Sequence, residues 1–238
     1  MIGTRTIATA GNPKNNRFGK TLIWFEILLI AASAYLALAH LDNTAFWDDE
    51  AQTGIIARNL VQTGRLTGWD GRNLFGYRNG NSLDLNLRPI NSPLDYIVAA
   101  GSFAVLGPST RAGRLPFAII GLIGLGLFSV LLRRDFEQQP ILRLYALAAL
   151  GFSIVFLLNI RQCRYYALAL SSSLLMFCAY KWFLASRQWR ASLVMAMTAA
   201  IMFYSNYLLC AVFLLALGSI HLIFHCRRLG PRDYLKLT

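Results

Sequence analysis

The sequence is short of charged residues, and acids are especially few. Charged side chains make up 14% of the chain, whereas water-soluble domains usually carry about 25%. Hydrophobic residues make up 56%. This balance excludes an ordinary water-soluble domain and indicates that lipid is the solvent for most of the chain.

The polar-apolar alternation of membrane barrel strands is also missing, as are internal repeats, low-complexity linkers and a separate soluble domain. Several apolar runs reach the ~20 residues that a helix needs to cross a bilayer. We therefore predict an all-α integral membrane protein, a polytopic helical bundle with about six transmembrane helices. The expected spans are 21–41, 114–132, 143–159, 166–184, 191–205 and 208–225.

Cysteine is sparse and has no metal-type spacing such as C-x-x-C. The four cysteines lie in or beside apolar runs: Cys163, Cys178, Cys210 and Cys226. We interpret them as small apolar residues rather than metal ligands or disulfide partners.

The formal net charge of +12 does not indicate nucleic-acid binding, because the basic residues gather at the ends of apolar runs. Residues 1–20 contain basic residues and no acid, which predicts a cytoplasmic N-terminus, and the basic tail 226–238 is also expected to be cytoplasmic. Between them, 21–225 form a transmembrane domain whose segment 42–112 is a large extracytoplasmic loop with juxtamembrane helices. We expect a multi-pass protein in a prokaryotic cytoplasmic membrane, in contact with membrane lipids.

Residues 93–107 are apolar but short, and Asp95 would be costly in hydrocarbon. We expect this segment to lie at the outer membrane surface, since a crossing here would turn the later basic loops outward. The segments 160–165 and 204–207 then lie on the same side as the acidic loop.

Three consecutive carboxylates, Asp48, Asp49 and Glu50, follow the first span. Adjacent like charges raise one another's pKa, a pattern found at catalytic sites. The alternative is that Asp48 or Asp49 caps a helix over 51–60.

A second group lies between two spans, where Arg161 and Arg164 precede Tyr166. Arginine suits phosphate oxygens and tyrosine suits a membrane interface. Arg114 adds an outer cation, while contact with lipid headgroups is the alternative for all three arginines. Asn206 lies at another outer turn, where an aromatic-belt role is the alternative.

Together these groups bring carboxylates and arginines to one face of the bundle. A carboxylate can accept a proton from an acceptor hydroxyl while an arginine neutralises a departing lipid phosphate. Transfer of a sugar from a lipid-linked phosphosugar requires this combination.

The sequence resembles the GT-C glycosyltransferases, in particular protein O-mannosyltransferases and lipid A aminoarabinose transferases. The matching pieces keep the family's order over nearly the whole chain: Trp47-x-Asp49-Glu50-Ala51, Ala57-Arg58-Asn59-Leu60, Thr63-Gly64, Ser92-Pro93-Leu94-Asp95-Tyr96, Leu106-Gly107, Arg114-Leu115-Pro116, Arg164-Tyr165-Tyr166-Ala167-Leu168 and Tyr204-Ser205-Asn206-Tyr207.

The resemblance implies a glycosyltransferase with a polyprenyl-phosphate sugar donor, an extracytoplasmic active site and a lipid, glycan or protein hydroxyl as acceptor. Asp49 would be the general base with Glu50 beside it, and Arg164 and Tyr166 would help form the donor site. The remaining candidate substrate-binding residues are Asp48, Arg58, Arg114, Arg161 and Asn206.

Two departures leave alternatives open. Gln162 and Asn206 stand where relatives often have an acid and a histidine, so use of a divalent metal at Asp49 and Glu50 stays undecided. Relatives are longer, so a second chain supplying the remaining part is a candidate partner. The alternative functions are a non-catalytic or split-subunit relative that binds the lipid carrier, and an unrelated transporter. Glu26 is the candidate mid-membrane charge for a transporter, and we expect it to snorkel to the cytoplasmic surface.

Overall fold

The computed structural model describes residues 13–68 and 92–224, with side chains from Leu22 onward. Over these residues the chain forms nine α-helices and no strand, which confirms the all-helical prediction. The helices are α1 Pro13–Leu38, α2 Asp48–Thr63, α3 Leu94–Leu106, α4 Thr110–Asp135, α5 Pro140–Gly151, α6 Ile154–Ile160, α7 Tyr166–Ser186, α8 Trp189–Ser205 and α9 Tyr207–Phe224.

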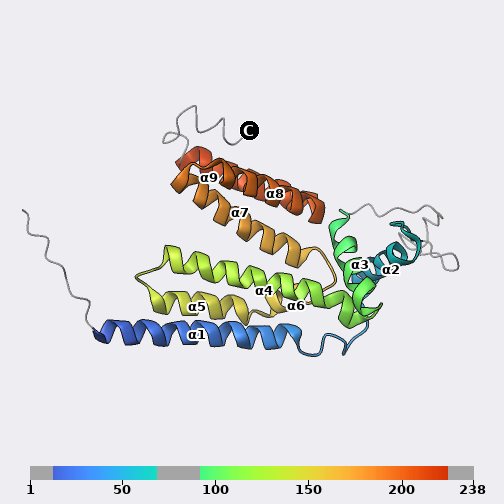
Figure 1. The fold of residues 1–238 in the computed structure, drawn as a ribbon, viewed down its shortest axis with the longest axis horizontal. Coiled ribbons are helices and arrows are strands. Elements are labelled where there is room, and N and C mark those ends of the chain that lie inside the picture. The colour runs from blue at the N-terminus through green and yellow to red at the C-terminus, as the bar shows by residue number, and fades with distance from the viewer. Residues whose placement is uncertain (1–12, 69–91, 225–238) are drawn as a thin grey trace, which may run out of the picture.

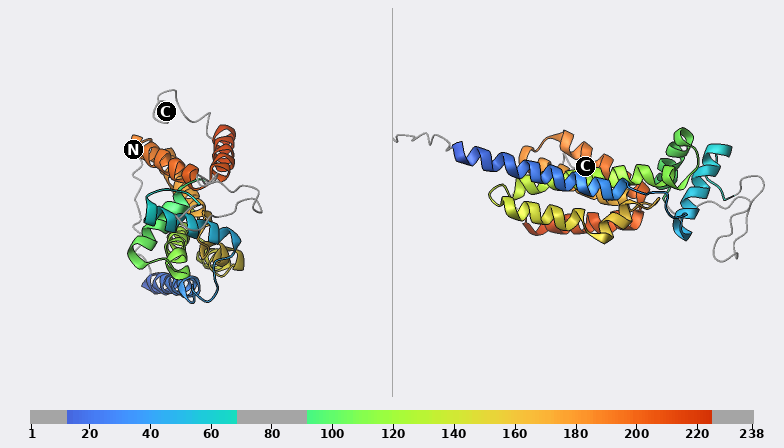
Figure 2. Two further views of the ribbon diagram at one scale, coloured as in Figure 1. Left: turned by 90° about the vertical axis from the view of Figure 1, so that its right-hand side faces the viewer. Right: turned by 90° about the horizontal axis from the view of Figure 1, so that it is seen from below.

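The long helices run side by side along one axis, whereas α2 and α3 lie across one end of this bundle (Figures 1 and 2). Successive long helices alternate in direction. The N-termini of α4 and α7, the 161–165 turn and the α8–α9 junction are therefore gathered at the α2–α3 end. The α4–α5 and α7–α8 connections lie at the opposite end (Figure 1).

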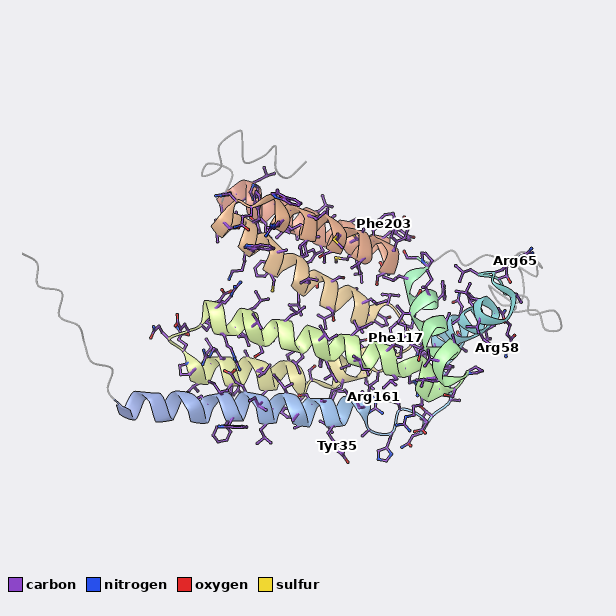
Figure 3. All side chains as sticks on the ribbon, in the orientation of Figure 1. Tyr35, Arg58, Arg65, Phe117, Arg161 and Phe203 are labelled. Atoms are coloured by element: carbon purple, nitrogen blue, oxygen red, sulfur yellow. The ribbon has the colours of Figure 1, made fainter. Side chains whose placement is uncertain are left out.

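Among the described helices, α4, α7 and α9 are long and apolar enough to cross a membrane, and the α5–α6 pair makes a fourth candidate. Large apolar side chains cover the outside: Trp24 is 70% exposed and Leu215 is 72% exposed. Tyr35 points away from the bundle, whereas Phe117 is fully buried inside it (Figure 3). This distribution supports a helical membrane protein.

The expected span 143–159 is not one helix, because α5 and α6 meet at an angle of 55°. Ser153 begins the second piece, and its hydroxyl accepts a hydrogen bond from the Phe156 N–H at 3.4 Å. A serine that caps a new helix competes with continuation of the old one. The apolar run gave no sign of this break.

Some predictions fall outside the described residues. These are residues 1–12 of the expected basic N-terminus, the loop segment 69–91 with Asp70 and Asp84, and the tail 225–238 with Cys226. The first described helix already begins at Pro13, within the segment expected to precede the span.

Small residues on α4 allow close helix packing, which drives association in lipid. A Cβ added at Gly121 would lie 2.4 Å from Ile160 Cβ on α6. Pro116 lacks an N–H and so leaves the Ala112 carbonyl without its helical donor. The Ser102 hydroxyl of α3 donates to this carbonyl at 2.6 Å, which joins α3 to the start of α4.

Glu26 does not snorkel, so that expectation was wrong. It is 2% exposed, and its carboxylate lies 2.6 Å from Arg133 Nε of α4 and 3.5 Å from Arg143 Nη2 of α5. A buried charge persists when partners compensate its desolvation. The pairing explains Glu26 as a link between three helices near the end opposite α2 and α3.

Candidate functional site

A buried polar contact at the α2–α3 end joins Glu50 of α2 to Arg114 of α4. Glu50 is fully buried, and its two carboxylate oxygens accept from Arg114 Nε at 2.9 Å and Nη2 at 2.6 Å. Arg114 also donates to the carbonyls of Leu41, Thr44 and Ala45 at 2.9 to 3.1 Å. The planar guanidinium thus holds the link between α1 and α2 against α4.

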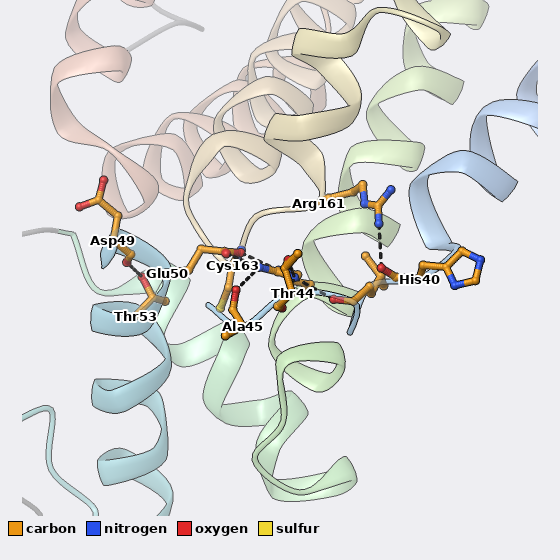
Figure 4. Close-up of polar contacts among 10 residues, drawn as sticks. His40, Thr44, Ala45, Asp49, Glu50, Thr53, Arg161 and Cys163 are labelled. Carbon is orange, nitrogen blue, oxygen red and sulfur yellow. Dashed lines mark hydrogen bonds and ion pairs between the residues drawn. The ribbon is translucent and has the colours of Figure 1, made fainter. Parts of the chain in front are cut away.

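The same carboxylate extends this contact to the turn before α7. Glu50 Oε1 accepts from the Cys163 N–H at 2.8 Å, and Figure 4 shows Glu50 directed at Cys163 while the Asp49 carboxylate points away from it. The two neighbouring acids therefore have different surroundings, and Glu50 is committed to holding the site together.

Asp49 forms an ion pair with Arg164 of the same turn. The Asp49 side chain is 40% exposed and that of Arg164 is 13% exposed, so the pair lies where the protein meets its surroundings. The prediction that the acid pair and the Arg-Tyr-Tyr turn lie together is confirmed by this contact.

The alternative that Asp48 or Asp49 caps a helix over 51–60 was wrong, because the helix begins earlier. Trp47 is the residue that precedes α2, no side chain caps the helix, and Asp48, Asp49 and Glu50 form its first turn. Their charges still favour the positive end of the helix dipole. Asp48 is exposed.

Aromatic rings surround the Arg164 guanidinium. Its Cζ lies 5.9 Å from the ring centre of Trp47, 5.3 Å from that of Tyr165 and 5.5 Å from that of Tyr166. Burial and the hydrogen bond with Tyr166 raise the pKa of Tyr165 to about 12, so its hydroxyl keeps its proton near neutral pH. The rings orient Arg164 and attract its charge.

An apolar groove of about 560 Å³ begins beside this cluster. Tyr166 and Asn159 line its end near Arg164, and Ser173 and Ala216 line it nearer the middle of the bundle. Residues of α5, α6, α7, α8 and α9 form its walls, which are almost entirely apolar. A long hydrocarbon chain fits such walls.

The other predicted residues have different surroundings. Arg161 donates to the carbonyls of Leu36, Ala39 and His40 at 2.8 to 3.0 Å, so it caps the C-terminus of α1 and its side chain is used there. Figure 4 shows its contact with His40. Carbonyls at a helix C-terminus attract a cation.

Arg58 also lies away from the Asp49–Arg164 pair, whereas Asn206 follows Ser205, whose hydroxyl donates to the Tyr165 carbonyl at 3.3 Å. The Asn206 side chain accepts from the Leu209 N–H at 2.9 Å at the start of α9. Arg58 is nine residues after Asp49, which places it on the opposite face of α2. There it lines a separate cavity of about 270 Å³ with residues of α3 and α4.

Sequence reasoning missed two groups at the site, Cys163 and Asp95. Cys163 is fully buried, and burial together with Glu50 and Asp95 raises the pKa of its thiol, so the thiol stays protonated. Asp95 is 3% exposed in the first turn of α3, close enough to Arg164 to feel its charge. For Asp95 the sequence did contain a signal, because this acid stands within the short apolar segment 93–107.

The surroundings of Glu50 and Asp49 do not fit a divalent cation. Both Glu50 oxygens already accept N–H groups, and Arg164 holds Asp49. Over the part of the chain that the structure describes, no group of three His, Cys, Asp or Glu side chains could hold a metal. Arginines provide the positive charge beside both acids.

Comparisons with protein-family models, with curated proteins and with solved structures each give no match. They assign no family. The resemblance to GT-C glycosyltransferases therefore stays a prediction.

Proposed function

We propose that the chain is a membrane glycosyltransferase that moves a sugar from a polyprenyl-phosphate donor to a hydroxyl acceptor outside the cytoplasm. The observation that carries this proposal is the position of the Asp49–Arg164 pair beside Tyr166, which contacts Arg164 and lines the apolar groove. An exposed carboxylate, a cation and a hydrocarbon-binding surface meet there. Those are the three requirements of the reaction.

The donor binds with its polyprenyl chain in the groove and its phosphate at Arg164. The guanidinium suits phosphate oxygens and is already oriented by aromatic rings. Tyr166 contacts Arg164 and also lines the groove, so one residue joins the two parts of the donor site.

The phosphate competes with Asp49 for Arg164 and so releases the carboxylate to act as general base. The acceptor oxygen then forms a bond with the anomeric carbon of the sugar, and its proton passes to Asp49. The bond from that carbon to the phosphate oxygen breaks, and the polyprenyl phosphate leaves with the electron pair. Arg164 stabilises the negative charge that develops on it.

Glu50 and Arg114 have a positioning role in this proposal. Their contacts hold the start of α2 against the 161–165 turn, and thereby hold Asp49 beside Arg164. No step uses a metal.

The proposal includes the six-span topology predicted from the sequence, with a cytoplasmic N-terminus and the α2–α3 end outside. The alternating direction of the long helices supports it (Figure 1). The opposite end carries the basic residues Arg133, Arg134, Lys181 and Arg187, in keeping with a cytoplasmic face.

The test measures sugar transfer by the purified full chain in nanodiscs, using a panel of radiolabelled polyprenyl-phosphate sugars and membrane-extract acceptors. Asp49→Asn keeps the shape of the side chain but removes the base, and we expect transfer to fall roughly 100-fold or more. The control is Asp42→Asn, which changes another exposed carboxylate, in the link between α1 and α2, and should leave transfer within about twofold.

Unchanged transfer by Asp49→Asn would refute the role of Asp49. Tight binding of the polyprenyl-phosphate sugars without transfer by the unmodified chain would instead support the non-catalytic, lipid-binding alternative.

A further inference from the structure

Trp47 is an exposed aromatic residue at the start of α2 that the proposed reaction does not use. Its backbone is extended, with φ −81° and ψ 170°, and its carbonyl accepts from the Ala51 N–H at 2.8 Å. Successive side chains of an extended chain point to opposite sides. The preceding Phe46 ring packs inward against Gly54 and Gly113, where an added Cβ would lie 2.8 and 2.4 Å from ring atoms. Trp47 is therefore turned outward, and 47% of it is exposed.

The Trp47 ring borders the Asp49–Arg164 pair. Its centre lies 5.9 Å from Arg164 Cζ, and Arg164 donates to the carboxylate of Asp49, two residues after Trp47. Tyr165 and Tyr166 contact the same guanidinium from the turn before α7, and their ring centres lie 4.4 Å apart. Both tyrosines are less exposed than Trp47. Of the three rings around Arg164, the indole thus offers a ligand the most surface.

The proposed reaction requires a sugar beside this ring. The donor phosphate lies at Arg164, and the anomeric carbon is bonded to one of the phosphate oxygens. The acceptor hydroxyl attacks the same carbon while its proton passes to Asp49. A sugar that meets both conditions lies next to the Asp49–Arg164 pair, in the space that the Trp47 ring borders.

An exposed indole suits one face of a pyranose ring. The C–H groups on that face are apolar and carry small positive charges, whereas the face of an indole carries negative charge. Contact between the two removes apolar surface from water and brings opposite charges together.

We propose that Trp47 binds the sugar of the donor by stacking its exposed face on the pyranose ring, so that the site selects a lipid phosphate carrying a pyranose with an apolar C–H face. This role rests on the proposed function, because it assumes that the lipid phosphate lies at Arg164. The alternative is that Trp47 anchors this end of the protein among lipid headgroups. Anchoring would affect every lipid ligand alike, with or without a sugar.

The experiment compares lipids that differ only in the sugar. Binding to the purified full chain in phosphatidylcholine nanodiscs is measured for polyprenyl phosphates carrying glucose, galactose or mannose, and for the sugar-free polyprenyl methyl phosphodiester. All four are phosphodiesters with a single negative charge, so the ratio of their affinities reports contacts of the sugar. We expect the unmodified chain to bind at least one phosphosugar roughly five- to tenfold more tightly than the methyl phosphodiester, the range that favourable contact with an aromatic face supplies.

Trp47→Leu keeps an apolar side chain but removes the ring, so the preference for the sugar-bearing lipid should fall to about twofold or less. Trp47→Phe keeps a smaller ring and should retain part of the preference. The matched control is Trp189→Leu, which changes another exposed tryptophan, at the start of α8 and at the opposite end of the bundle (Figure 1). This control should keep the full preference.

An unchanged affinity ratio in Trp47→Leu would overturn the stacking role, even if both lipids bound more weakly, because that result fits anchoring or orientation of Arg164. Equal binding of the sugar-bearing and sugar-free lipids by the unmodified chain would also overturn it, and this comparison holds even if Trp47→Leu folds poorly. Neither result would contradict the phosphate site at Arg164. Failure of the unmodified chain to bind any of the four lipids would refute the proposed donor site, and this role with it.

Discussion

Replacing Glu50 with glutamine should strongly destabilise the α2–α3 end of the protein. The substitution keeps the size of the side chain but removes the charge that compensates Arg114. It also turns one acceptor oxygen into an NH₂ group, whereas both Glu50 oxygens now accept N–H groups, from Arg114 and from Cys163. At least one donor would therefore face another donor.

The magnitude follows from burial. The side chains of Glu50 and Arg114 are 1% and 10% exposed, so water does not replace the lost partner. Removing one member of a buried ion pair typically costs about 3–5 kcal/mol. Arg114→Met should cost a similar amount, because it strands Glu50 and leaves the carbonyls of Leu41, Thr44 and Ala45 without their donor.

A double-mutant cycle separates the pair from its surroundings. The free energy of unfolding is measured by reversible SDS titration in mixed micelles for Glu50→Gln, Arg114→Met and the double variant. We expect the double variant to be more stable than the sum of the two single effects by about 1–3 kcal/mol, since each single change already breaks the pair. Asp42→Asn, at an exposed position in the link between α1 and α2, is the control and should show no measurable change. Simple additivity of the two single effects would refute the inference that this pair holds the site together.

Three further predictions concern stability. Arg161→Gln should lower the free energy of unfolding by up to about 1 kcal/mol, because it uncaps the C-terminus of α1. The same change should leave the affinity for polyprenyl phosphate unchanged. A large loss of affinity would instead place Arg161 in the donor site. Gly121→Ala should lower the free energy of unfolding by about 1–3 kcal/mol, because the added Cβ clashes with Ile160. Gly126→Ala on the same helix meets open space, so it should be neutral or stabilising. Equal effects of the two substitutions would contradict the packing of α4 against α6. The pKa of Asp95 rises from its ordinary value of 3.8 to about 7 on folding, so the folded protein binds the extra proton between these values. Thermal stability should therefore fall as pH rises toward 7 and level off above it, and Asp95→Asn should remove this contribution, which thermal unfolding at several pH values would check.

Much of the architecture could be predicted because it depends on local composition and on the side of the membrane each segment must occupy. Apolar runs located all the long helices, since lipid leaves the backbone no other spanning form. Counting helical passes predicted that the acids after the first span and the Arg-Tyr-Tyr turn lie at the same end. The Asp49–Arg164 contact confirms their proximity.

The break between α5 and α6 and the individual roles of the arginines could not be obtained in this way. Arg114, Arg161 and Arg164 looked alike in sequence, yet one is enclosed by Glu50 and carbonyls, one caps α1, and one pairs with an exposed acid. Their partners lie far away along the chain, and no local pattern records which guanidinium reaches which oxygen.

The sequence by itself determined that this is a helical membrane protein with acids and arginines at a common end, because hydropathy and charge act on each segment separately. The tertiary structure alone decided that Glu50 is enclosed while Asp49 is partly exposed, that Asp95 is buried, and that Tyr166 lines a groove. Burial is the physical reason for this division. Packing between helices that are distant in the sequence sets how polar the surroundings of a side chain are and which hydrogen bonds it can still form. These two properties give the carboxylates of Asp49, Glu50 and Asp95 different chemical roles.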